Sequence, residues 1–275
     1  MAALRPGVTV VGNDLLIRTG SAAVLAAIAL GAAWFGGPAT GLVAAVATVV
    51  VWFEWASIAG ASDAEARILA FPVGIATLVG GFGFLGLGFV IAGGTVLGLL
   101  LGRSSPWPAA GIAYATIPGL CLLAIRLSAE LGLTALFFVF AVVWATDTGA
   151  FFAGRTIGGA KLWPRVSPKK TWAGAIGGLV AATIAGALVA GGAGFVLSPA
   201  LIVTAVLLSI ACQLGDLFES AVKRRFGVKD SGHIIPGHGG LMDRVDGLVF
   251  ACALAASIGW VRGGPDHIAA GLLRW

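Results

Sequence analysis

The stretch that organises this chain is residues 220–246, which read SAVKRRFGVKDSGHIIPGHGGLMDRVD. Eight of these 27 residues are Lys, Arg or Asp, whereas only 11% of the whole 275-residue chain is charged. The remainder is unusually apolar, because 59% of all residues are hydrophobic, against about 45 to 50% in soluble domains. We therefore interpret the chain as a polytopic membrane protein whose apolar helices hold this polar stretch in position.

Long uncharged runs around this stretch predict about nine membrane spans, since about 20 apolar residues are needed to cross a bilayer. The runs cover residues 19–36, 39–58, 68–84, 85–102, 107–126, 131–147, 172–191, 199–217 and 246–261. Between the third and fourth runs, the sequence GGFGFLGLG (80–88) allows either a tight turn or one bent continuous helix. The first run lacks a small-residue cleavage site at its end, so we expect it to be retained as a helix.

The predicted fold is all-α, with one integral-membrane domain over residues 1–275. Within it we expect an N-terminal transmembrane scaffold at 1–130 and a catalytic transmembrane region at 131–262. Helices that cross the same bilayer share one embedded core, so we expect no separate soluble domain. The three cysteines (Cys121, Cys212, Cys252) lie in apolar runs without a C-x-x-C spacing, which predicts small buried residues and neither disulfides nor zinc.

The distribution of Lys and Arg predicts how the chain is oriented, because these residues collect in cytoplasmic loops. With a cytoplasmic N-terminus, fourteen Lys and Arg residues lie on the cytoplasmic side of the membrane and three on the opposite side. The charged loops around 147–171 and 220–246 then both face the cytoplasm. The hairpin of runs 172–191 and 199–217 joins them, so they should lie side by side. A GxxxG motif at Gly174 to Gly178 predicts close helix packing, with a chance occurrence in a Gly-rich chain as the alternative.

Four aspartates stand at the predicted ends of membrane helices: Asp147, Asp216, Asp243 and Asp246. An ionised carboxylate near the hydrocarbon region is costly unless it is paired or metal-bound, so these residues are functional candidates. A solvated helix cap is the alternative for any single one. Asp243 and Asp246 are three residues apart and share a helix face. Carboxylates clustered without Cys or paired His suit Mg2+.

Basic residues accompany these acids and could bind phosphate by charge and hydrogen bonding. They are Lys169, Lys170, Lys223, Arg224, Arg225, Lys229 and Arg244. The ordinary positive-inside excess accounts for part of this set but not for its alternation with acids. Mg2+ beside Lys and Arg implies a nucleotide or another polyphosphate. We expect no nucleic-acid partner, because the basic residues are not interleaved with exposed aromatics. For His238, between two glycines, ligand contact and plain exposure are equal alternatives.

The polar stretch resembles the signature of the phosphatidate cytidylyltransferases, also called CDP-diacylglycerol synthases. The matching pattern is SxVKR at 220–224 followed by KDxGxxIPxHGGxxDRxD at 229–246. The first loop is also similar to that of the family, with DxxAxxxGR at 147–155 and SPKKTWxG at 167–174. By these motifs the resemblance covers residues 140–262, and one departure is Phe151, where the family commonly has Tyr.

The resemblance implies transfer of CMP from CTP to phosphatidic acid, giving CDP-diacylglycerol and pyrophosphate. It implies that Asp216, Asp243 and Asp246 bind Mg2+ and that Asp147 is a further ligand, with a second cation left open. The implied catalytic set is Asp216, Asp243, Asp246, Lys223 and Arg224. The implied substrate-binding set is Ser167, Lys169, Lys170, Ser220, Lys229, His238 and Arg244.

Because CTP is cytosolic and phosphatidic acid lies in the membrane, we expect a site at the cytoplasmic face of a bacterial plasma membrane. We also predict a cleft open to lipid, and the sequence leaves a homodimer open. One alternative function is a CTP-dependent polyprenol or phytol-type lipid kinase, in which the γ-phosphate moves. Another is a membrane transporter, which predicts acids at the middle of the spans.

Overall fold

A computed structural model describes residues 9–102, 105–235 and 239–275, with side chains from residue 20 onward. The predicted all-α fold is confirmed. The helices are α1 (Thr9–Phe35), α2 (Gly37–Ile58), α3 (Asp63–Gly81), α4 (Leu85–Gly102), α5 (Trp107–Arg126), α6 (Gly132–Thr156), α7 (Trp172–Gly192), α8 (Pro199–Arg225), α9 (Met242–Gly263) and α10 (Ile268–Leu273). Strands β1 (Lys161–Trp163) and β2 (Ser167–Thr171) form a short antiparallel hairpin within the first charged loop.

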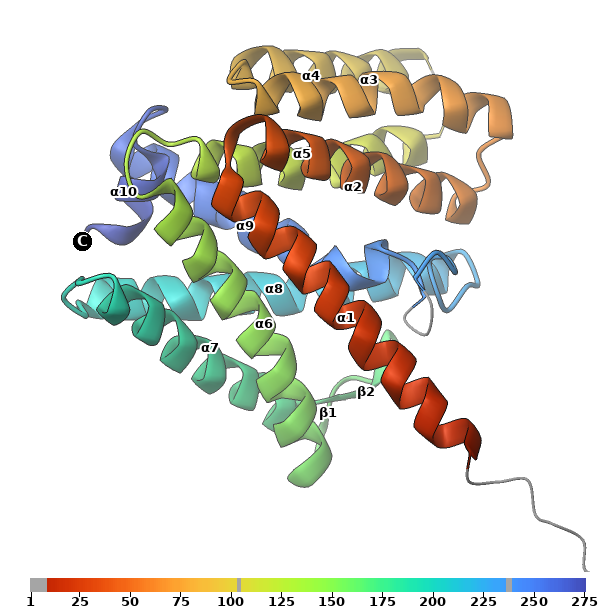
Figure 1. The fold of residues 1–275 in the computed structure, drawn as a ribbon. Helices are drawn as coiled ribbons and strands as arrows, with labels where there is room; N and C mark the ends of the chain where they lie inside the picture. Colours follow the sequence, from red (N-terminus) through yellow and green to blue (C-terminus); the bar gives the residue numbers. More distant parts are fainter. Residues whose placement is uncertain (1–8, 103–104, 236–238) are drawn as a thin grey trace, which may run out of the picture.

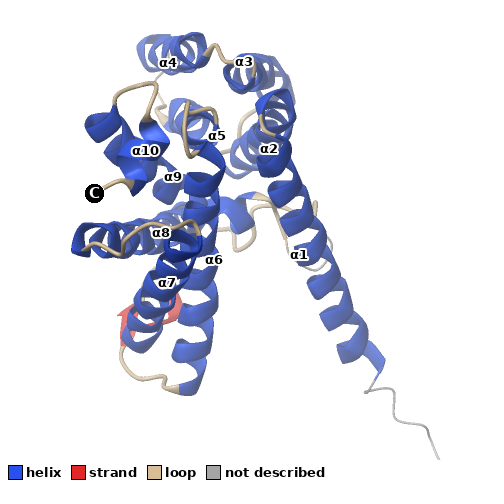
Figure 2. Cartoon of the chain, turned by 60° about the vertical axis from the view of Figure 1, so that its left-hand side comes forward, coloured by secondary structure: helices blue, strands red, loops and turns tan. Residues whose placement is uncertain are grey.

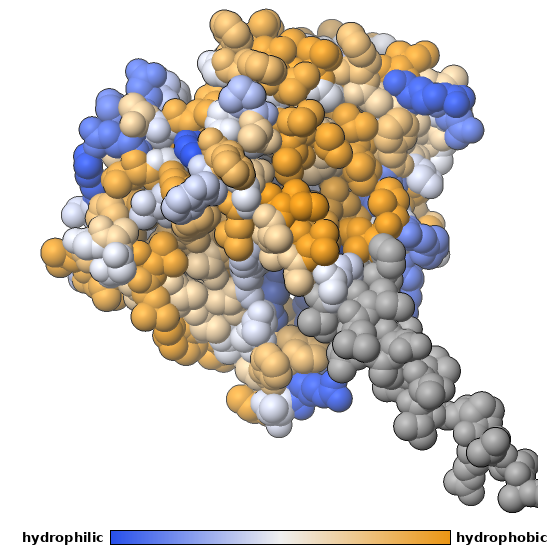
Figure 3. All heavy atoms as spheres, viewed as in Figure 1, coloured by the Kyte–Doolittle hydropathy of each residue, from blue (hydrophilic) through white to orange (hydrophobic). Residues whose placement is uncertain are grey.

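Eight helices in the described part of the chain, α2 to α9, are long and apolar enough to cross a membrane. The segment Gly20–Phe35 of α1 is a further, shorter apolar helix, which agrees with the predicted count of about nine. Hydrophobic residues cover much of the visible face, and hydrophilic residues gather at its left and right edges and at its lower end (Figure 3). At residues 82–84 the chain makes a tight turn and not a bent helix, because Gly83 adopts a φ of 94°.

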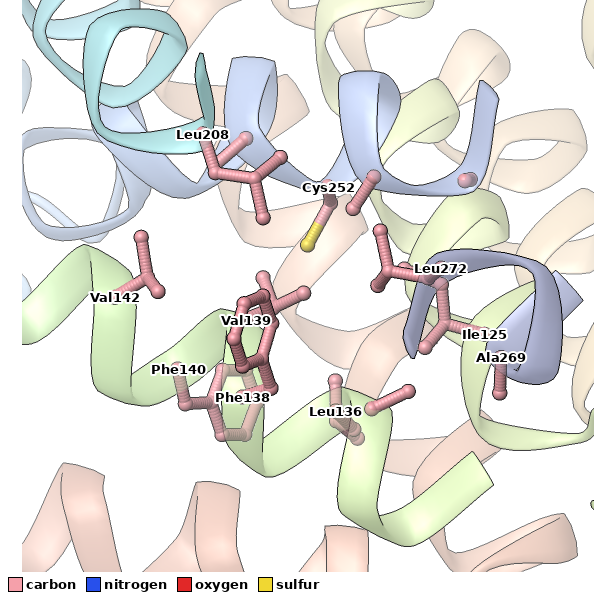
Figure 4. Packing of buried hydrophobic residues seen from close by; sticks show 14 of the residues in the cluster. Ile125, Leu136, Phe138, Val139, Phe140, Val142, Leu208, Cys252, Ala269 and Leu272 are labelled. Atoms are coloured by element: carbon pink, nitrogen blue, oxygen red, sulfur yellow. The ribbon is translucent and has the colours of Figure 1, made fainter. Parts of the chain in front are cut away.

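The helices lie in successive layers (Figures 1 and 2). Helices α3 and α4 are outermost on one side and cover α2 and α5, which contact α9; α8 lies beside α9, and α6 and α7 pack together below them. The largest core cluster has buried members on every helix from α5 through α10, among them Phe138, Val139 and Leu208 (Figure 4). The layers bring both ends of the polar stretch against helices from the N-terminal half.

The C-terminal ends of α6 and α8 lie beyond the predicted spans, which corrects the position of two aspartates. Helix α6 continues to Thr156 and α8 to Arg225, so Asp147 and Asp216 lie within helices and not at their ends. The extra turns of α8 are rich in Lys and Arg, which are good helix formers. Two residues past the end of α8, Gly227 has a φ of +71°, which reverses the chain, and Val228 N–H donates to the Lys223 carbonyl at 3.0 Å.

Small residues explain why α6 and α7 pack so closely. A Cβ added at Gly174 would lie 2.9 Å from the Ala150 carbonyl oxygen, and one at Gly178 would lie 2.9 Å from that of Thr146. The close packing predicted from the GxxxG motif is therefore confirmed, with α6 as the partner. Thr171 caps α7 by accepting a hydrogen bond from Gly174 N–H at 3.1 Å, which fixes the β2–α7 junction.

Candidate active site

The candidate site is built where α8 crosses α9. A Cβ added at Gly215 would lie 2.4 Å from the Asp246 carbonyl oxygen, and one at Gly247 would lie 2.5 Å from the Cys212 sulfur. Only glycine permits such a close approach of two helix backbones at these positions. The crossing therefore brings Asp216 of α8 next to Asp246 of α9, as the sequence predicted.

Three acidic side chains meet at this crossing: Asp216, Glu219 and Asp246, hereafter the carboxylate trio. One oxygen of each lies within 4.8 Å of the others, close enough to hold one metal ion. Glu219 is only 1% exposed, and its Oε1 has no hydrogen-bond partner among the described residues. An unpaired buried carboxylate oxygen is costly, so this atom fits a ligand position. The trio offers the hard oxygen donors that Mg2+ prefers.

The sequence analysis missed Glu219. Its spacing of three residues from Asp216 on one helix face was a signal that could have identified it. The family pattern begins at Ser220, one residue after Glu219, so the motif does not include this acid.

Two lysines flank the trio. Lys223 Nζ lies 2.7 Å from Glu219 Oε2 and 2.6 Å from Asp243 Oδ1, so it joins α8 to α9. Lys170, on β2, forms an ion pair with Asp216. This ion pair joins the first charged loop to α8 four residues before the second loop begins, and direct contact between the two loops stays a prediction. The site thus combines acids that can bind a cation with amines that can bind phosphate.

Asp243 lies next to the trio but is not a member of it. Its Oδ2 accepts hydrogen bonds from Ser231 N–H and Gly240 N–H, both at 3.0 Å, while Oδ1 faces Lys223. These contacts tie the loop before α9 to the first turn of that helix. In this arrangement the protein itself occupies both oxygens of Asp243.

A second acid that the sequence analysis missed, Glu54, anchors the same loop from α2. Its two oxygens accept hydrogen bonds from Leu241 N–H at 2.8 Å, Met242 N–H at 2.7 Å and the Ser231 hydroxyl at 3.2 Å. Glu54 is 4% exposed. It caps the N-terminus of α9, where the N-cap residue Leu241 has no side chain that could accept a hydrogen bond. The signal for it was a lone acid within the apolar run VVVWFEWAS.

The other predicted site residues surround this centre. Asp147, on α6, accepts a contact from the Cys212 thiol at 3.7 Å and lies outside the trio. Ser167 and Ser220 are half-buried, on β2 and α8. The predicted basic residues with exposed side chains are Lys169, Arg224, Arg225, Lys229 and Arg244. His238 lies outside the described residues. The individual roles of all these residues stay predictions.

The chain matches known proteins over most of its length. The profile of the "Cytidylyltransferase family" matches residues 16–261. A protein of Brucella abortus (strain 9-941) named phosphatidate cytidylyltransferase is 42% identical over 267 residues, which cover 94% of this chain and 98% of that protein. The protein of the same name from Staphylococcus haemolyticus is 49% identical over 124 residues, which cover 45% of this chain and 48% of that protein. The one from Bacillus subtilis (strain 168) is 43% identical over 136 residues, which cover 48% of this chain and 51% of that protein.

The extent of these matches goes beyond that of the motifs. The motif resemblance begins near residue 140, whereas the family match and the Brucella match also include the N-terminal helices. Glu54 lies in that N-terminal part, so the anchoring of the loop before α9 falls within the matched region.

Proposed function

This chain belongs to the cytidylyltransferase family, and we propose that it transfers CMP from CTP to phosphatidic acid, giving CDP-diacylglycerol and pyrophosphate. The observation that carries the proposal is the carboxylate trio with Lys170 and Lys223 beside it. Oxygen ligands for a cation and amines for phosphate, side by side, suit a nucleoside triphosphate.

Asp216, Glu219 and Asp246 would hold the Mg2+ ion, and Glu219 Oε1 would thereby gain its missing partner. When bound, such an ion stabilises negative charge on phosphate oxygens. Asp243, whose oxygens are already bonded, we assign to positioning the loop before α9. We propose Asp147 as a further ligand, with room for a second cation.

The reaction requires alignment more than activation of the nucleophile. The phosphate oxygen of phosphatidic acid is already anionic at neutral pH. It forms a bond to the α-phosphorus of CTP as the bond from that phosphorus to the bridging oxygen breaks, and pyrophosphate leaves with the electron pair. Lys170 and Lys223 are placed to hold the phosphate groups in this alignment and to neutralise their charge.

We place the site at the cytoplasmic face of a bacterial plasma membrane. Supporting this, the C-terminal end of α8 carries Lys223, Arg224 and Arg225, as expected of a cytoplasmic segment. The relatives compared above are bacterial. At this face a soluble nucleotide and a membrane lipid can meet without either crossing the bilayer.

The test uses the purified protein in detergent with phosphatidic acid, Mg2+ and CTP labelled at the α- or the γ-phosphate. The proposal requires α label in the lipid and release of pyrophosphate. Transfer of γ label would instead identify a lipid kinase. No transfer of either label, by protein shown to be folded, would contradict both and favour a transporter.

A further inference from the structure

A largely apolar groove lies between α2, α5 and α9, which neighbour one another in the fold (Figure 1). It holds a free volume of about 80 Å³ and is partly open to the outside. Small residues of α2 and α5, among them Ala44, Ala47 and Gly119, leave the space, and Leu248 of α9 lines the facing wall. The groove extends along α5 from Leu122 to Tyr114, eight residues, or roughly 12 Å.

Two polar side chains, Thr48 and Tyr114, line this groove, and Thr48 already accepts a hydrogen bond from the Thr77 hydroxyl at 3.4 Å. Tyr114 is 6% exposed, and its hydroxyl has no hydrogen-bond partner among the described residues. Its ring is held between Trp55, at 5.1 Å between ring centroids, and Phe218, at 5.8 Å. Buried tyrosine hydroxyls usually have a partner, so a fixed one without any is a position where a ligand group fits.

The Tyr114 end of the groove lies beside the carboxylate trio. Phe218, which packs on Tyr114, lies between Asp216 and Glu219 on α8. On α9, Val245 lines the groove and directly precedes Asp246. A molecule with its phosphate near the trio could therefore extend its apolar part into the groove.

We propose that this groove holds one acyl chain of the lipid substrate, and that the Tyr114 hydroxyl donates a hydrogen bond to an oxygen at the head of that chain. The proposal rests on the proposed function and names the lipid subsite of the same site. The occupant is an acyl chain because the wall is largely apolar, the groove extends roughly 12 Å along α5, and it adjoins the trio that would bind the phosphate end. Within a membrane, surrounding lipid is as apolar as the groove, so the groove aligns the chain more than it adds affinity.

The first test narrows the groove. Ala47 lines it, whereas its neighbour Val46 is 57% exposed on α2 and lies outside it, so Ala47→Phe and Val46→Phe form a matched pair. With CTP saturating, kcat/KM is measured for dioleoyl and dihexanoyl phosphatidic acid. The ratio of the first to the second should fall about tenfold in Ala47→Phe, the order expected for lost apolar contacts in a pocket, and stay unchanged in Val46→Phe. Equal ratios in both variants would overturn the proposal.

The second test removes the hydroxyl. Tyr114→Phe should lower kcat/KM for both lipids about tenfold, the value of roughly one hydrogen bond, while the KM for CTP is unchanged. The melting temperature should not fall, because the removed hydroxyl has no hydrogen-bond partner in the part of the chain that the structure describes. Unchanged kinetics, or a loss of stability that accounts for the lower activity, would contradict this role of Tyr114.

A photoreactive phosphatidic acid with a diazirine in its acyl chain tests the subsite without turnover. Labelled peptides should come from α2, α5 and α9, and labelling should decrease in Ala47→Phe but not in Val46→Phe. Labelling confined to other helices would overturn the groove assignment. Specific labelling of the groove in protein that transfers no CMP would instead refute the proposed function and leave the lipid subsite standing.

Discussion

Two groups of acidic side chains meet near the start of α9, and they differ in how far the protein satisfies their oxygens. Glu54 and Asp243, the anchored acids, accept hydrogen bonds from backbone N–H groups of the loop before α9 and its first turn. In the carboxylate trio, Glu219 Oε1 has no partner among the described residues. The anchored acids hold the loop in place, whereas the trio retains capacity for a ligand. Proximity to a motif therefore does not by itself separate a structural acid from a ligand-binding one.

The largest effect is expected where a member of the trio loses its charge. Asp246→Asn should reduce CMP transfer by roughly a thousandfold or more, because the site loses a carboxylate that would hold the metal ion. A thousandfold loss corresponds to about 4 kcal/mol of transition-state stabilisation. The melting temperature should stay close to that of the wild type. Initial rates with α-labelled CTP measure the change. Normal turnover in this variant would remove Asp246 from the site.

The anchored acids should matter most for stability. Glu54→Gln is expected to lower the free energy of unfolding by about 2 to 4 kcal/mol, because three donors, two of them in buried hydrogen bonds, lose a charged acceptor. Denaturant unfolding in detergent measures this value. The matched control is Glu219→Gln, which should cost less, since one Glu219 oxygen already lacks a partner. A larger loss in the control would reverse the comparison between the two groups.

Mg2+ should distinguish the two groups directly. At about a hundred times its dissociation constant, Mg2+ should stabilise the wild-type protein by about 2.7 kcal/mol, seen as a rise in melting temperature. Asp246→Asn should lose this rise, and Asp243→Asn should keep it despite a lower starting stability. If Asp243→Asn also loses the rise, Asp243 is a metal ligand, as the family resemblance implies.

The smallest effect on stability is expected at the β hairpin. Lys170→Met breaks a partly exposed ion pair with Asp216 and should change the free energy of unfolding by less than about 1 kcal/mol. It should nevertheless raise the KM for CTP several-fold more than Lys169→Met, whose side chain is exposed. Steady-state kinetics with varied CTP test this pair of variants. Equal KM values for CTP in the two variants would mean that Lys170 has no special contact with the nucleotide.

The sequence by itself determined the membrane class, the approximate spans and most of the acids and bases that gather at the site. These features depend on local composition and on residues a few positions apart, which a helix places on one face regardless of what it packs against. Asp216 and Lys223 are an example, since both belong to one uninterrupted helix. The family motif added the expected chemistry.

Only the tertiary structure decided which acids are anchored and which are available to a ligand. Glu54 is 187 residues from its partner Leu241, and Tyr114 meets Phe218 from another helix, so neither pairing leaves a local pattern. The lengths of α6 and α8 likewise depended on packing and capping that hydropathy does not report. Whether a buried oxygen is satisfied depends on every group that the fold brings within hydrogen-bonding distance, and this information is spread over the whole chain.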